Sequence, residues 1–96
     1  MTKETELLSV TSSPDGTEVT VHLDKAGLEA LISRLQLLLR THAKGDCEHI
    51  HLMSQSWGLG DLSETMLEDE KKQQHRQVHH LKIYAWTEAW RKKHGL

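Results

Sequence analysis

The stretch VTVHLDKAGLEALISRLQLLLR, residues 19–40, decides the fold, because the spacing of its apolar residues changes at Asp24. Before Asp24, residues 17–23 alternate between apolar and polar, which is typical of a half-buried antiparallel strand. After Asp24 the apolar residues recur at helical spacing, and the Asp24 side chain can accept hydrogen bonds from a first helical turn. We therefore predict a strand that leads into an amphipathic helix over about residues 24–43. The apolar positions are Val19, Val21 and Leu23 in the strand and Leu28, Leu31, Ile32, Leu35, Leu38 and Leu39 in the helix.

The helix should present one face to a core and the other to solvent. We expect the stripe from Leu28 to Leu39 to be core, and Gly45 to cap the helix end. A helix that is apolar on both faces would indicate an oligomer, and polar residues argue against this here. They are Ser33, Arg34, Gln36 and Arg40.

A turn precedes the strand, and two further strand-like segments follow the helix. Residues 6–12 lead into Ser13-Pro14-Asp15-Gly16, where Pro and Gly favour a tight turn, so a hairpin is predicted. Residues 48–53 and 77–86 also alternate. We expect one face of these strands to meet the helix through Ile50, Leu52, Leu81, Ile83 and Ala85. The opposite face would carry His49, His51, Met53, Val78, His80, Lys82, Tyr84 and Trp86, joined by Thr20 and His22.

These elements predict an α+β fold of order ββαββ, with a small antiparallel sheet of about four strands and one helix packed on one face. We expect residues 1–96 to form a single domain. Residues 54–76 would be a long charged loop, and residues 87–96 a short C-terminal helix or a tail.

Composition narrows the range of functions. Twelve Lys and Arg against fourteen Asp and Glu give a net charge of −2, and no basic stripe suits a phosphate backbone, so nucleic acid is not an expected partner. Cys47 is the only cysteine, which fits a reducing cytoplasm. We expect neither a signal segment nor a membrane span, because the longest apolar run is Leu37-Leu38-Leu39.

The histidines raise the question of a metal site. A strand would project His49 and His51 on one side, and imidazoles so placed could ligate zinc. Cys47 lies two residues before His49, but working Cys–His pairs are usually assembled from distant segments. No carboxylate on the strands plainly completes a metal site, so no cofactor is predicted, and His49 and His51 are kept as metal candidates only.

A binding surface is the stronger prediction. One helix covers one face of a sheet, so the opposite face stays open, with Tyr84 and Trp86 among polar groups. Large aromatic side chains in such surroundings are common anchors of protein interfaces.

Four segments carry a resemblance to a known family. They are His51-Leu52-Met53, Ser56-Trp57-Gly58, Leu62-Ser63-Glu64 and the strand Leu81-Lys82-Ile83-Tyr84-Ala85-Trp86. Together with the Pro14-Asp15-Gly16 turn, they resemble the immunity protein 32 family of bacteria over about residues 6–86. The resemblance implies a small cytoplasmic protein that binds and neutralises a toxin, without catalytic residues of its own. Residues 65–77 and 87–96 fall outside the resemblance.

We therefore predict a non-catalytic immunity protein whose partner is a cognate bacterial toxin. The expected contacts are Trp57, Asp61, Glu64, Tyr84 and Trp86. Two alternatives remain open, namely a metal-binding protein organised by histidines and a small structural or regulatory subunit of another complex. The sequence does not indicate an oligomeric state.

Overall fold

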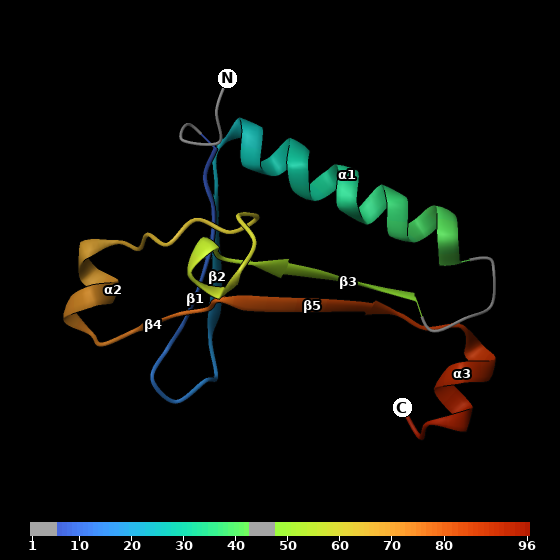
Figure 1. Cartoon of the computed structure of the whole chain (residues 1–96). Coiled ribbons are helices and arrows are strands. Elements are labelled where there is room, and N and C mark those ends of the chain that lie inside the picture. Colours follow the sequence, from blue (N-terminus) through green and yellow to red (C-terminus); the bar gives the residue numbers. More distant parts are fainter. Residues whose placement is uncertain (1–5, 43–47) are drawn as a thin grey trace.

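The computed structural model describes residues 6–42 and 48–96 and has five strands and one long helix among them (Figure 1). The predicted cap Gly45 and Cys47 lie outside these residues. The elements are β1 (Leu8–Ser12), β2 (Val19–Leu23), α1 (Lys25–His42), β3 (Glu48–Met53), the 3-10 turn η2 (Gln55–Trp57), α2 (Glu68–Lys72), β4 (Arg76–Gln77), β5 (His80–Ala85) and α3 (Glu88–Lys93).

The strands form two small antiparallel sheets. The predicted α+β class is confirmed, but the predicted single sheet of about four strands is wrong. One sheet has the order β2-β1-β4, and the other pairs β3 with β5. The chain passes from the first to the second between β4 and β5. Val78 donates its backbone N–H to the carbonyl of Val10, whereas the carbonyl of His79 accepts from Ser54. The continuous segment from β4 to β5 therefore forms backbone hydrogen bonds with both sheets.

The two predicted local signals at the start of the chain are confirmed. Gly16 has a φ of 77°, and Ser13 donates its N–H to the Glu18 carbonyl at 2.9 Å, which closes the hairpin between β1 and β2. Asp24 caps α1, because its Oδ1 accepts the Gly27 N–H at 2.7 Å.

The core lies where the two sheets meet beneath the first half of α1. Leu8, Val10, Leu52 and Leu62 form its buried centre. Leu23, Leu31, Val78 and Leu81 pack around that centre. Val78 therefore faces the core rather than the open sheet face on which we placed it, because its N–H bond to β1 turns the chain there. Further along α1, Leu38 is buried, as is Ile50 of β3.

The predicted inner face of α1 is partly wrong. Gly27, Leu31 and Leu38 lie on the buried or half-buried side, and Arg34 lies with them, donating to the His51 carbonyl at 3.0 Å. The other predicted core residues are exposed, namely Leu28, Ile32, Leu35 and Leu39. A two-stranded sheet is too narrow to cover the whole apolar half of the helix, which explains the difference.

The β2 strand also differs from its predicted burial. Val19 is 58% and Val21 is 43% exposed, so of the three apolar residues of the strand only Leu23 packs against the core. His22 does not join the histidines of β3, because β2 belongs to the other sheet and its imidazole Nε2 lies 3.0 Å from a Glu70 carboxylate oxygen. Thr20 lies in the same strand, away from β3. Among residues 6–42 and 48–96, no helix is long and apolar enough to cross a membrane.

Candidate functional site

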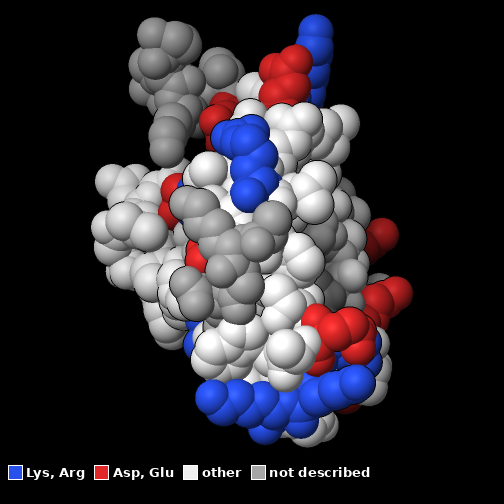
Figure 2. Space-filling model, turned by 90° about the vertical axis from the view of Figure 1, so that its right-hand side faces the viewer, with Lys and Arg blue, Asp and Glu red and all other residues white. Residues whose placement is uncertain are grey.

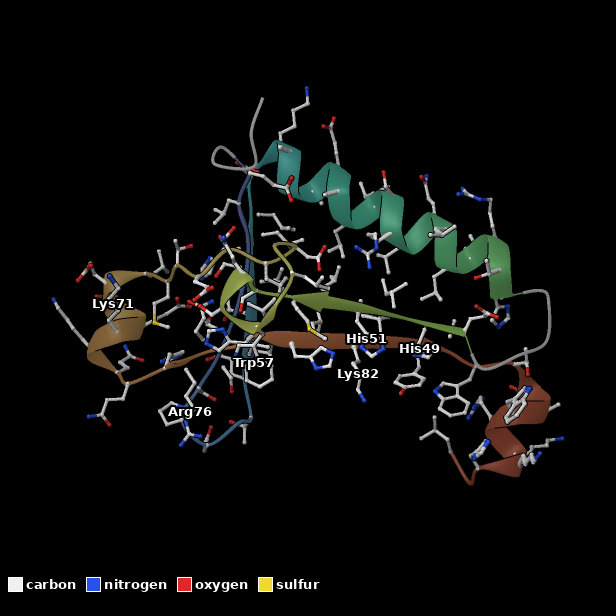
Figure 3. All side chains as sticks on the ribbon, viewed as in Figure 1. His49, His51, Trp57, Lys71, Arg76 and Lys82 are labelled. Atoms are coloured by element: carbon white, nitrogen blue, oxygen red, sulfur yellow. The ribbon has the colours of Figure 1, made fainter. Side chains whose placement is uncertain are left out.

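The face of the β3–β5 sheet that lies away from α1 carries aromatic side chains. The register places His49 opposite Tyr84 and His51 opposite Lys82, so these four share one face. Their backbone neighbours Ile50 and Leu52 are buried on the other face. Figure 3 shows His49, His51 and Lys82 pointing away from α1. This arrangement of the two faces agrees with the prediction from strand alternation.

The rings on this face are in contact with each other. His49 stacks on Tyr84 with 4.8 Å between ring centroids, and His51 stacks on His80 at 5.0 Å. His49 and His51 meet edge to face at 4.8 Å, which joins the two stacks. A hydrogen bond of 2.8 Å links His51 Nδ1 to His80 Nε2. Rings that stack across strands hold one another in a fixed orientation.

The contacts continue toward the C-terminus. Tyr84 stacks on Trp86 at 5.7 Å, and Trp86 meets His94 at 5.5 Å. His94, the residue that follows α3, stacks in turn on Trp90 of that helix at 5.1 Å. Thr87 positions this helix, because its hydroxyl oxygen accepts the Trp90 N–H at 3.2 Å.

At the other end, the contacts reach Trp57 in η2. The indole lies parallel to the His79 ring at 5.6 Å and meets His80 at 6.4 Å. Glu64 holds the η2 turn, because its carboxylate accepts from the Ser56 N–H at 3.0 Å and from the Ser56 hydroxyl at 2.8 Å. We use the name ring row for this continuous set, which consists of Trp57, His80, His51, His49, Tyr84, Trp86, His94 and Trp90.

Positive charge accompanies the ring row. Lys82 Nζ lies 5.7 Å from the centre of the Tyr84 ring, and Lys93 Nζ lies 4.8 Å from that of Trp90. Figure 2 shows Lys and Arg side chains gathered at the α3 end of the molecule. Burial, followed by positive charge on neighbouring groups, lowers the pKa of His51 below its ordinary value. The neutral form of that ring is therefore favoured in the folded protein.

The predicted contact residues separate into two groups. Trp57, Tyr84 and Trp86 all belong to the ring row, and Trp57 is 58% and Tyr84 40% exposed. Glu64 lies beside the row, and its hydrogen bonds to Ser56 lower the pKa of its carboxyl group. Asp61 lies instead against β3, where it accepts the Met53 N–H at 3.1 Å and pairs with Arg34.

Trp90 and His94 are members of the ring row that we assigned neither to the predicted contacts nor to the predicted open face of the sheet. Their spacing of four residues in a short predicted helix is the signal that could have identified them. The contact of His94 with Trp86 depends on the turn between β5 and α3, and no local pattern encodes that turn.

The metal candidates His49 and His51 meet edge to face, with 4.8 Å between their ring centroids. Within the part of the chain that the structure describes, no group of three or more His, Cys, Asp or Glu residues is placed to hold a metal ion. Cys47 falls outside that part. The ring row is thus a surface suited to stacking and to burial against a partner.

No family model, curated protein or solved structure matches this chain.

Proposed function

We propose that this chain is a non-catalytic binding protein that acts in the bacterial cytoplasm and neutralises a protein toxin by covering part of its surface. The observation that carries the proposal is the ring row, a series of rings in mutual contact of which Trp57 and Tyr84 are exposed. The resemblance of residues 6–86 to the immunity protein 32 family supports a toxin as the partner. This role requires no cofactor.

The ring row has the physical properties of an interface anchor. Partly exposed Trp and Tyr side chains bury much apolar surface when a partner covers them. Such side chains dominate the affinity of many interfaces. Because each ring already stacks on a neighbour, binding orders few additional side-chain rotations. The rings are therefore already ordered in the free protein, before a partner binds.

The charges around the row favour an acidic partner surface. Lys82 and Lys93 lie over rings of the row. Arg91 and Lys92 lie next to Lys93 in the last turn of α3. Carboxylates on the toxin would meet these cations at the rim of the interface, which mainly accelerates association. In this account Glu64 acts by holding Trp57 in place, and Asp61 acts by fixing the edge of β3.

Coexpression with the product of the adjacent gene, as the candidate toxin, tests the proposal. The wild-type chain should protect the cell and copurify with the toxin. Replacing Trp57, Tyr84 or Trp86 by Ala should each weaken toxin binding by about tenfold or more, which is the effect of removing an interface anchor.

Val19→Ala is the matched control, because Val19 is as exposed as Trp57 but lies on β2, outside the ring row. This variant should bind like the wild type. Absence of both complex and protection with the wild-type chain would refute the immunity function. Full binding by a folded variant that lacks all three aromatic side chains would refute the ring row as the contact surface.

A further inference from the structure

Helix α1 has a second apolar stripe that the strands do not cover. Leu28, Ile32, Leu35 and Leu39 are 46%, 43%, 40% and 73% exposed. An α-helix rotates by about 100° per residue. The stripe therefore lies roughly 100° around the helix axis from the buried side chain of Leu38. In Figure 1 the strands lie along only one side of α1. We use the name seam for the four exposed residues.

The spacing within the seam is that of a helix that packs on another helix. Successive members are four, three and four residues apart, as at the core positions of a coiled coil. This spacing reads the same from either end of α1. Such a pattern suits an antiparallel pair, because a two-fold axis perpendicular to the helices then places Leu28 of one copy opposite Leu39 of the other, and Ile32 opposite Leu35.

The surface area of the chain points the same way. The chain exposes 6705 Å², whereas a compact monomer of this mass exposes about 5,600 Å². Its radius of gyration is 15.2 Å, compared with about 12.5 Å for a compact chain of this length. This surplus of about 1,100 Å² is distributed over the whole chain, and covering the seam would remove part of it.

Charge selects the direction in which two copies would pair. Glu29 is the only acidic residue of α1, and Arg40 lies on the same flank near the other end. Within the described part of the chain, neither residue forms an ion pair. Parallel packing would keep Glu29 and the Arg40 of the partner at opposite ends of the pair. Antiparallel packing brings each Glu29 near the partner's Arg40 instead.

We propose that two copies of this chain associate through the seam, with their α1 helices antiparallel and the two-fold axis between Ile32 and Leu35. Leu28 of each copy then packs near Leu39 of the other. The dimer leaves the ring row free, because the row lies on the face of β3 and β5 away from α1 (Figure 3).

Molar mass measured by light scattering during size-exclusion chromatography tests the dimer, under reducing conditions so that Cys47 cannot link two chains. The wild type should have twice the monomer mass at micromolar to near-millimolar concentrations, and Leu35→Glu should have the monomer mass. Leu37→Glu is the matched control, since Leu37 is 45% exposed but lies on the opposite side of α1 from the seam. Circular dichroism should show both variants folded.

Charge reversal tests the antiparallel arrangement. Glu29→Arg and Arg40→Glu should each weaken the dimer, and the double variant should restore it. A wild type that stays monomeric throughout, or a dimer that survives Leu35→Glu, would overturn the proposal. If the seam instead holds the toxin, Leu35→Glu would abolish toxin binding by a chain that is monomeric already. Our proposal expects the Leu35→Glu monomer to bind toxin through the ring row.

Discussion

Gly27 sets how closely α1 approaches the chain segment before β1. A Cβ atom at this position would lie 1.7 Å from the carbonyl oxygen of Leu7, which no small adjustment of a side chain can relieve. The same residue donates its N–H to the Asp24 cap. The crossing of helix and strand therefore depends on the absence of a side chain at position 27.

We predict that Gly27→Ala destabilises the protein, although Ala favours a helix over Gly by about 1 kcal/mol. The clash with the Leu7 carbonyl should outweigh that gain and lower the free energy of unfolding, as measured by urea titration. Ser33→Ala on the exposed side of α1 is the control and should be neutral or slightly stabilising. A Gly27→Ala protein more stable than the wild type would show that the helix does not approach Leu7 this closely.

Glu70 joins α2 to the first sheet. Its carboxylate accepts the Thr11 hydroxyl at 3.0 Å and the Leu67 N–H at 2.9 Å, and it pairs with His22. Burial raises the pKa of Glu70, but the hydrogen bonds from Leu67, His22 and Thr11 outweigh burial, so the pKa is lowered below its ordinary value of 4.5. The folded protein thus favours the ionised carboxylate.

This lowered pKa predicts how stability depends on pH. The unfolded chain binds a proton at Glu70 more readily than the folded chain, so the contribution of Glu70 is complete well above pH 4.5 and is lost as the pH falls through the folded pKa. Glu70→Gln should lower the free energy of unfolding at pH 7 and reduce its acid dependence below pH 5. Thermal unfolding across this range is the measurement, with Glu68→Gln on the exposed side of α2 as the control. Equal acid dependence in wild type and Glu70→Gln would contradict the network.

At the level of elements, α1 shows what periodicity can and cannot predict. The helix, its Asp24 cap and its approximate length were predictable, because each depends on neighbouring residues. The part of its apolar half that meets the strands was not predictable. Leucines occupy about half of the circumference, and the sheet covers only some of them. Arg34 was placed outside on charge alone, yet a backbone carbonyl and Asp61 supply its partners within the fold.

Two adjacent leucines of α1 test this assignment. Leu38 is 6% exposed and packs inward, whereas Leu37 is 45% exposed and lies outside the seam. Leu38→Ala should lower the free energy of unfolding by about 2–5 kcal/mol, the usual cost of emptying a core position. Leu37→Ala should change it by less than about 1 kcal/mol. Similar losses at both positions, measured by chemical denaturation, would mean that the helix is rotated from the orientation described.

The β3–β5 pair was the most predictable part of the candidate site. Strand alternation placed His49, His51 and Tyr84 on one face, and the register confirms it. The split into two sheets was not predictable in the same way, because it depends on Val78 and His79 bonding to different partners across the chain. Long-range hydrogen bonds of this kind leave no mark on local periodicity.

The whole molecule is an open arrangement with two different surfaces. The ring row lies on one side of the β3–β5 sheet, and α1 with its seam lies on the other. Few apolar residues of this small chain are fully buried, so a partner that covers either surface should add to its stability. We assign the seam to a second copy and the ring row to the toxin.

The most direct test is the affinity of the chain for the product of the adjacent gene, the candidate toxin, measured calorimetrically with the wild type and with Tyr84→Ala. Tyr84 lies within the ring row between His49 and Trp86. We predict that the wild type binds and that Tyr84→Ala binds about tenfold or more weakly, while Val19→Ala binds like the wild type. Equal affinities for wild type and Tyr84→Ala would contradict it.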